Sequence, residues 1–214
     1  MIKRIAVLVS GGGTNLQCII DGIKSGIITN AEISVVISSN YDAYALRRAE
    51  KAGIKTEVLN REYFLTANEF ERETYSAQLS ELIEKYDTDL IVMAGFMTIL
   101  SYGFIVFNRS RTINVHPSLI PAFCGDGMYG LRPHEAAIER GVKLAGATVH
   151  FVNEVADGGP IILQKAIDVK EWDTPATLQQ RVMTECEQVI LPKAIDLFCN
   201  DRIEMNGKKA IIKD

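Results

Sequence analysis

The sequence has few of the residues that mark zinc-binding and disulfide-rich proteins. Its 214 residues include four cysteines, three histidines and one tryptophan. No two cysteines form a CxxC pair, so their spacing matches neither a zinc ribbon nor a dense disulfide framework. We therefore expect reduced thiols that act as packing residues, as in a reducing cytoplasm, at Cys18, Cys124, Cys186 and Cys199.

Long apolar runs and long basic runs are also missing. The first apolar run, Ile5–Val9, ends at glycines and is shorter than the apolar part of a signal peptide. No run reaches the roughly 18 apolar residues that a membrane-spanning helix needs. The 23 Lys and Arg residues against 27 Asp and Glu give a net charge of -4, which argues against a nucleic-acid partner. We expect a cytoplasmic protein, monomeric or homodimeric, that binds neither nucleic acid nor membranes.

The first half of the sequence alternates short β-branched runs with longer segments of helical periodicity. Such alternation predicts βαβ units, and apolar strands without polar alternation are typical of strands buried on both faces. We therefore predict an α/β fold, Rossmann-like, with a mostly parallel sheet and helices on both faces. The expected strands are Ile5–Val9, Ile33–Ile37 and Asp89–Met93, and the expected helices are Asn15–Lys24, Ala43–Ala52 and Asn68–Tyr86.

The second half is richer in turns. A strand is expected at Thr112–Val115, followed by a turn-rich stretch from His116 to Pro133 that contains prolines and glycines. No internal repeat or flexible linker is present, so we expect one domain. The later elements are a helix at His134–Arg140, strands at Ala147–Val152 and Ile161–Gln164, a helix at about Pro175–Phe198, and a hairpin that turns at Asn206–Gly207.

A glycine loop, Ser10–Asn15, lies between the first strand and the first helix. Glycines allow close approach of a ligand, and a helix N-terminus offers N–H groups and partial positive charge, so phosphate is the expected guest. The loop is neither GxGxxG nor a P-loop, which gives no support for NAD or ATP. The alternative is a tight turn that needs glycine, with Thr14 or Asn15 as the N-cap.

The tract from Asn114 to Pro121 follows the strand predicted at the start of the second half. In an extended segment Asn114 and His116 project to the same side, at the sheet edge where open α/β sheets bind ligands. An amide donor and an imidazole could thus converge on one atom. The alternative is a structural histidine that caps the turn. Zinc is a weaker alternative, because the three histidines have no HExxH spacing.

The segment Asp157–Pro160, Asp-Gly-Gly-Pro, also has two interpretations. It is ordinary turn chemistry, in which Asp bonds its own backbone. It could also bring Asp157 close to His116, where a carboxylate stabilises the imidazolium form. The sequence alone leaves both open.

Five tracts resemble one known family when they are taken in order. They are VLVSGGGTNLQ near the start, MAGFMTIL from Met93, INVHPSLIPAF from Ile113, GATVHFV from Gly146 and DGGPIILQ from Asp157. Together they resemble the phosphoribosylglycinamide formyltransferases, folate-dependent enzymes of purine synthesis. The resemblance implies the formyltransferase fold and transfer of a formyl group from 10-formyltetrahydrofolate, a co-substrate, to the amine of glycinamide ribonucleotide. It implies small-molecule substrates and no metal.

The resemblance also implies roles for individual residues. The catalytic residues are expected to be Asn114, His116 and Asp157. The ribonucleotide is expected to contact Gly13, Thr14, Asn15 and Glu187. The folate is expected to contact Met97, Thr98, Ile99, Leu100, Asn114, Asn153, Glu154, Val155, Ala156 and Asp157. The expected single domain, 1–214, then consists of a ribonucleotide-binding half (1–108), a folate-binding and catalytic half (109–200) and a C-terminal hairpin (201–214).

The chain departs from the family pattern at several points. Thr98 stands where many relatives have Arg, and Ala67 or Asn68 stands where many have an Arg that contacts the folate tail. Arg61 and Arg72 flank that point, and the sequence leaves the folate-tail contact unassigned. The match of Glu187 requires one extra residue in the last long helix, after Arg181.

Three other functions remain in view. A formyltetrahydrofolate hydrolase would use a similar trio with water in place of the amine, but usually has an N-terminal regulatory domain, for which a first strand near Arg4 leaves no room. A methionyl-tRNA formyltransferase normally adds a C-terminal tRNA-binding domain, which we do not expect here. A non-catalytic folate or nucleotide binder would have no need of all three trio residues.

Overall fold

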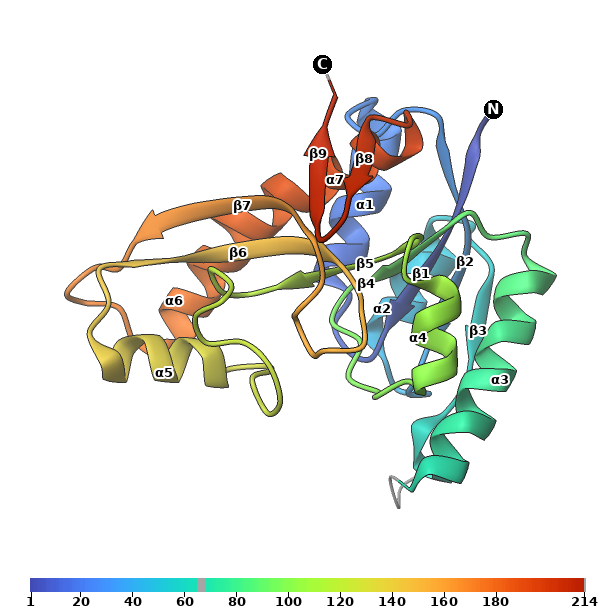
Figure 1. Cartoon of the computed structure of the whole chain (residues 1–214), viewed down its shortest axis with the longest axis horizontal. Helices are drawn as coiled ribbons and strands as arrows, with labels where there is room; N and C mark the ends of the chain where they lie inside the picture. Colours follow the sequence, from blue (N-terminus) through green and yellow to red (C-terminus); the bar gives the residue numbers. More distant parts are fainter. Residues whose placement is uncertain (65–67, 214) are drawn as a thin grey trace. The chain divides into compact units, whose positions relative to one another are not determined.

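A computed structural model describes residues 1–64 and 68–213 of the chain (Figure 1). The chain divides into two units, Met1–Ile113 and Asn114–Asp214, which are described in turn. The strand β5, Thr112–His116, contains the division. No helix among the described residues is both long enough and apolar enough to cross a membrane.

The first unit contains a parallel sheet in the strand order β3-β2-β1-β4. Helices follow the strands in the alternation expected from the sequence, so the predicted α/β class is confirmed. The strands are β1 (Lys3–Val9), β2 (Ala31–Ser38), β3 (Thr56–Val58) and β4 (Leu90–Met93). The helices are α1 (Thr14–Ser25), α2 (Tyr44–Lys51), α3 (Glu69–Lys85) and α4 (Tyr102–Asn108), with a short 3₁₀ helix at Arg61–Phe64.

The central strand β1 is apolar and buried on both faces. Residues Ile5–Val9 are fully shielded from solvent. Because side chains alternate along a strand, Ala6 and Leu8 face one side of the sheet and their neighbours face the other. Ala6 and Leu8 belong to a core cluster that includes residues of α3 and α4. The sequence pattern of a strand covered on both faces therefore matches the burial of β1.

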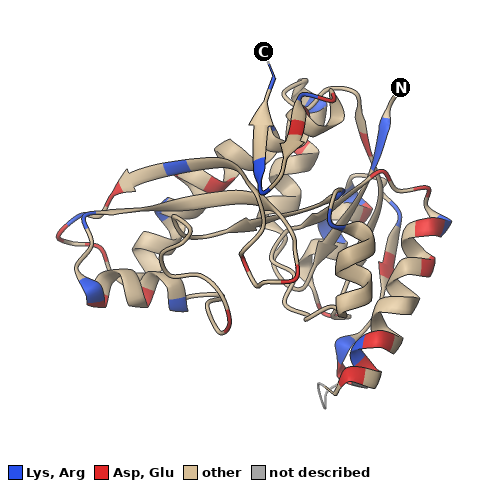
Figure 2. Cartoon of the chain, viewed as in Figure 1, with Lys and Arg blue, Asp and Glu red and all other residues tan. Residues whose placement is uncertain are grey.

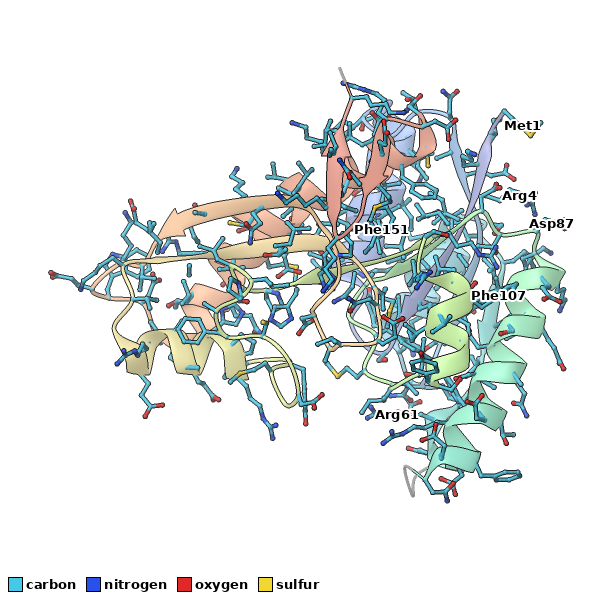
Figure 3. All side chains as sticks on the ribbon, viewed as in Figure 1. Met1, Arg4, Arg61, Asp87, Phe107 and Phe151 are labelled. Atoms are coloured by element: carbon cyan, nitrogen blue, oxygen red, sulfur yellow. The ribbon has the colours of Figure 1, made fainter. Side chains whose placement is uncertain are left out.

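The outer surface of the first unit is polar along α3. Glu residues lie along this helix together with Arg72 and Lys85 (Figure 2). Asn68 caps the helix by accepting a hydrogen bond from the backbone N–H of Glu71. Each of the helices α3 and α4 also exposes a phenylalanine, Phe70 on α3 and Phe107 on α4, the latter labelled in Figure 3.

The second unit contains residues 114–116 of β5, then β6 (Leu144–Phe151) and β7 (Ile161–Asp168), with β6 between its two neighbours. The strands β6 and β7 are antiparallel, and the almost fully buried β6 contrasts with the alternating burial of β7. The remaining elements are α5 (Arg132–Arg140), α6 (Pro175–Val182), a π-helical segment (Met183–Glu187), α7 (Gln188–Cys199), and the antiparallel hairpin of β8 (Ile203–Asn206) and β9 (Lys209–Ile212).

The long helix expected at Pro175–Phe198 is not regular. A π-helical segment, Met183–Glu187, separates α6 from α7. Pro192 lies inside α7 and lacks the N–H that would continue the ladder of helical hydrogen bonds. The sequence pattern also missed two short elements of the first unit, β3 and α4, whose few residues give little periodicity.

Candidate active site

Asn114 and His116 contact the same carboxylate. The Asn114 Nδ2 atom lies 3.5 Å from Asp157 Oδ1, and His116 Nδ1 lies 3.3 Å from Asp157 Oδ2. The alternation of β5 places both side chains on one side of the strand. His116 is buried, and Asp157 is mostly buried. The trio that the resemblance singles out is therefore together in space, within the second unit.

Asp157 is aimed by a tight loop between β6 and β7. Its backbone is left-handed, with φ 54°. The loop is closed by a hydrogen bond from Gly158 N–H to the Val155 carbonyl, 2.9 Å long. A Cβ at Gly158 would lie 2.7 Å from Val155 Cβ, and a Cβ at Gly159 would overlap the Phe151 carbonyl oxygen. The Asp-Gly-Gly segment is thus a turn, as its composition indicates, and that turn directs the Asp157 carboxylate at His116.

His116 lies between two acceptors. Its Nε2 atom is 3.0 Å from the Phe123 carbonyl oxygen, which can only accept, so Nε2 carries a proton. Its Nδ1 atom faces the Asp157 carboxylate. A doubly protonated imidazolium satisfies both contacts. The contact with Phe123 is the turn contact of a structural histidine, and the contact with Asp157 is the one the catalytic interpretation requires.

The pKa of Asp157 is lowered from its ordinary value of 3.8. Burial acts in the opposite direction and would raise it. The imidazole of His150, the backbone N–H of Gly125 at 2.9 Å from Oδ2, and the charge on His116 together outweigh burial. Asp157 is therefore an anion at neutral pH, as a partner for an imidazolium must be.

His150 is a member of the cluster that sequence reasoning did not assign to the site. Its Nδ1 atom lies 2.8 Å from the Phe151 carbonyl, which accepts its hydrogen bond. That Nε2 atom lies 3.3 Å from Asn114 Nδ2 and 3.6 Å from Asp157 Oδ1. His150 thus orients the Asn114 amide. The sequence offered one signal for His150: it lies in the tract GATVHFV, which resembles the family and forms part of β6, the strand beside β5.

His134 on α5 is buried and neutral. Burial, and then the charge on His116, lower the pKa of His134 from 6.5 to about 4. Its Nε2 atom has no hydrogen-bond partner in the described part of the chain. The ring lines a small cavity of about 90 Å³ that is otherwise mostly apolar, with Leu119, Phe123 and Ala137 among its walls.

The glycine loop belongs to the first unit. Helix α1 begins at Thr14, and its N-cap is Gly13, with φ 70° and no side-chain cap. The expectation that Thr14 or Asn15 serves as N-cap is therefore wrong, because the left-handed backbone of Gly13 starts the helix itself. Gly11, Gly12 and Thr14 are exposed, and Asn15 is buried. The loop thus presents backbone at the N-terminus of α1.

The predicted folate segment of the first unit is tied to the glycine loop. The backbone N–H of Met97 donates to Ser10 Oγ at 2.9 Å. Arg61, labelled in Figure 3, donates to the Met97 carbonyl at 3.4 Å. Met97 and Ile99 are exposed, Thr98 is half-buried, and Leu100 is buried. Asn68 caps α3, and Ala67 lies outside the described residues.

The other predicted folate residues, Asn153–Asp157, form the loop between β6 and β7. Glu154, Val155 and Ala156 are exposed at its tip. Asn153 holds the loop through Nδ2, which donates to the Gly158 carbonyl at 3.1 Å, and through Oδ1, which accepts from the Val155 N–H at 3.0 Å. The two predicted folate segments belong to different units.

Glu187 is the last residue of the π-helical segment and is buried. A π turn contains one residue more than an α turn, and such turns are frequent at functional sites. The extra residue that the sequence match requires lies in the interval from Arg181 to Glu187, which contains the π-helical segment.

No group of three or more His, Cys, Asp and Glu residues among those the structure describes is arranged to hold a metal ion. The zinc interpretation considered for the three histidines thus finds no cluster there. All four cysteines are free thiols.

Comparisons with known proteins agree with the motifs. The family model described as "Formyl transferase" matches residues 3–195. The phosphoribosylglycinamide formyltransferase of Escherichia coli (strain K12) is 40% identical over 207 residues, which cover 97% of this chain and 92% of that protein. The trifunctional purine biosynthetic protein adenosine-3 of Homo sapiens is 39% identical over 99% of this chain, which spans only 20% of that longer protein.

A solved structure is similar over the whole chain. Glycinamide ribonucleotide transformylase 1 from Symbiobacterium toebii has a TM-score of 0.89 and 40% identity, with 100% of this chain and 95% of that chain covered. The predicted Rossmann-like formyltransferase fold is thereby confirmed. The resemblance drawn from the five tracts is confirmed as well, since the chain belongs to the formyl transferase family.

Proposed function

We propose that this protein transfers a formyl group from 10-formyltetrahydrofolate to the amine of glycinamide ribonucleotide. The product is formylglycinamide ribonucleotide, an intermediate of de novo purine (IMP) biosynthesis. The observation that carries the proposal is the convergence of Asn114 and His116 on the Asp157 carboxylate, in a chain that belongs to the formyl transferase family. The free thiols of the four cysteines are consistent with a reducing cytoplasm as its location.

The trio supplies what formyl transfer needs at the formyl oxygen. The neutral amine attacks the formyl carbon, and negative charge develops on the oxygen. Asn114 Nδ2 and the imidazolium of His116 donate hydrogen bonds to that oxygen, and one such donor can stabilise a transition state by roughly 3 kcal/mol. For His116 Nε2 to donate, the formyl oxygen takes the place of the Phe123 carbonyl as acceptor.

Asp157 has two tasks in this mechanism. Its carboxylate stabilises the imidazolium of His116, from which it lies 3.3 Å away. It also assists the proton that leaves the attacking amine and reaches the folate nitrogen when the carbon–nitrogen bond of the donor breaks. The mechanism involves neither a covalent enzyme intermediate nor a metal-dependent step.

The binding residues are proposed from the family match together with their local structure. The backbone at the half-buried Gly13 and the exposed Thr14 suits the ribonucleotide phosphate, because a helix N-terminus favours an anion. Asn15 and the buried Glu187 complete the proposed ribonucleotide contacts. The proposed folate contacts are Met97, Thr98, Ile99, Leu100, Asn114, Asn153, Glu154, Val155, Ala156 and Asp157.

The test is release of tetrahydrofolate from 10-formyltetrahydrofolate, measured with and without glycinamide ribonucleotide. The proposal requires release that depends on the ribonucleotide, with stoichiometric formylated product. Equal release without the ribonucleotide identifies a formyltetrahydrofolate hydrolase. No release in either reaction, with folate still bound, identifies a non-catalytic binder, and either of these results rejects the transferase.

A further inference from the structure

Helix α2 holds the glycine loop through two consecutive carbonyl groups. The backbone N–H of Ala45 donates to the Gly11 carbonyl at 3.0 Å, and Arg48 Nε donates to the Gly12 carbonyl at 2.9 Å. The next residue, Gly13, packs so closely on α2 that a Cβ there would lie 2.6 Å from Ala45 Cβ. Three successive loop residues are therefore fixed by one helix.

Arg48 is itself held by further contacts. Its Nη1 atom lies 3.3 Å from Gln17 Oε1 on α1, and its guanidinium lies 5.1 Å from the centre of the Tyr44 ring. The side chain is half-buried between these partners. A guanidinium is planar with donors in a fixed arrangement, so these contacts define the direction of the bond to Gly12.

The bonded carbonyls determine which way the loop amides point. In a trans peptide unit the C=O of one residue and the N–H of the next point in opposite directions. With the Gly11 and Gly12 carbonyls turned towards α2, the N–H groups of Gly12 and Gly13 are turned away from it. Successive backbone N–H groups on one side of a loop form an anion-binding concavity, and a carbonyl turned to that side would repel the anion.

We propose that Arg48 is a positioning residue for the phosphate of the ribonucleotide, acting through its bond to the Gly12 carbonyl. The proposal rests on the proposed function, which makes the glycine loop the phosphate site. Arg48 keeps the Gly12–Gly13 peptide in the anion-binding orientation and adds a fixed positive charge beside the loop. It contacts the loop on the side opposite to the amides that face the phosphate.

Three variants test the proposal by steady-state kinetics. Arg48→Met removes the bond and the charge, and Arg48→Lys keeps the charge but lacks the planar guanidinium. Arg47→Met is the matched control, because Arg47 carries the same charge on the same helix and is exposed. We expect both Arg48 variants to raise KM for the ribonucleotide about tenfold, with kcat within about threefold and KM for the formyl donor unchanged. Arg47→Met stays close to the unmodified protein.

Other patterns overturn the proposal. An unchanged KM in Arg48→Met means that the bond to Gly12 is irrelevant to binding. A normal KM in Arg48→Lys, or an equal rise in Arg47→Met, means that charge alone matters. A loss of kcat with unchanged KM means that Arg48 acts on the chemistry or on the general fold.

A second measurement separates this proposal from the proposed function. Inorganic phosphate is titrated into ¹⁵N-labelled protein while the amide signals of Gly12 and Gly13 are followed. We expect both signals to shift, with about tenfold weaker binding in Arg48→Lys. This result supports the positioning role even if formyl transfer to the ribonucleotide is absent. Equal binding by the Lys variant, or no response of either amide while formyl transfer proceeds, overturns the positioning role.

Discussion

The glycine loop after β1 and the cluster at the end of β5 are built from different groups. The loop presents backbone, with an exposed turn and a helix that starts at Gly13 without a side-chain cap. The cluster consists of side chains from three segments that meet at the Asp157 carboxylate. A backbone site depends on peptide orientation, whereas a side-chain site depends on residue identity. The glycine loop, Ser10–Asn15, is called the backbone region below, and the cluster around Asp157 is called the side-chain region. The two regions should therefore respond differently to substitution.

The largest expected effect is loss of turnover from the side-chain cluster. His116→Ala and Asp157→Asn should each lower kcat between about 100-fold and 1,000-fold, because in the proposed mechanism each removes a group that stabilises charge or transfers a proton. Asparagine tolerates the left-handed backbone of Asp157, so that variant should fold. Asp126→Asn, an exposed carboxylate of the neighbouring loop, is the control and should keep normal turnover. Normal turnover in either trio variant removes that residue from the mechanism.

The sequence predicted the positions of Asn114 and His116 in this cluster, but not the contacts made by Asp157 and His150. The short strand-like segment Thr112–Val115 predicted a strand, and strand alternation placed Asn114 and His116 on one side. The approach of Asp157 depends on the pairing of β6 with β7 and on a left-handed turn, neither of which a local pattern contains. His150 joins the site only because β6 lies beside β5. Its role therefore had to come from the structure.

The backbone region was harder to anticipate. The glycines indicated a tight turn, but the close packing of the N-cap residue Gly13 on Ala45 is a contact between distant residues that no local pattern contains. The π-helical segment before α7 also has no local signature, since its residues are ordinary helix formers and β-branched or sulfur-containing side chains. Helix α4 was missed because Tyr102–Asn108 is short and rich in aromatic and β-branched residues.

The second effect is a loss of unfolding free energy at acid pH, caused by the buried His134 of the second unit. The pKa of His134 is about 4 in the folded protein against 6.5 ordinarily, so the unfolded chain takes up the proton first. The stabilisation is complete above pH 6.5 and is lost as the pH falls from 6.5 to 4, by about 3 kcal/mol at most. The pKa of Asp157 is lowered from 3.8, so its stabilisation is fully present across this window and is lost only as the pH falls below 3.8.

Urea unfolding measures how His134 contributes to the unfolding free energy. The unmodified protein and His134→Gln are compared at several pH values between 6.5 and 4. The difference in unfolding free energy between the two proteins should shrink as the pH falls. A difference that stays constant across this window would show that His134 is not held neutral by the fold.

A smaller stability effect distinguishes two glycines of the backbone region. Gly13→Ala introduces a Cβ at φ 70° against Ala45 and should lower the unfolding free energy by about 2 kcal/mol. Gly12→Ala places its Cβ in open space and is the matched control, with a change of less than about 0.5 kcal/mol. Thermal or denaturant unfolding compares them. Equal destabilisation would mean that glycine content, and not the contact with α2, matters in this loop.

The smallest effect is expected at His150, which contacts Asn114 and in the proposed mechanism does not donate to the formyl oxygen. His150→Gln should lower kcat about fivefold, the loss of one hydrogen bond worth roughly 1 kcal/mol, with both KM values unchanged. The steady-state constants of the purified variant test this. A loss as large as that of His116→Ala would place His150 among the groups that act on the substrate directly.

The central claim is that the backbone region binds the ribonucleotide and the side-chain region performs the transfer. The most direct test compares kcat and the ribonucleotide KM for Arg48→Met and Asp157→Asn under one set of conditions. Arg48 holds the Gly12 carbonyl of the glycine loop, so its loss should raise KM about tenfold and leave kcat within about threefold. Asp157→Asn should lower kcat at least 100-fold with KM within about threefold. If both variants change the same constant, the two regions do not have separate tasks and the account is contradicted.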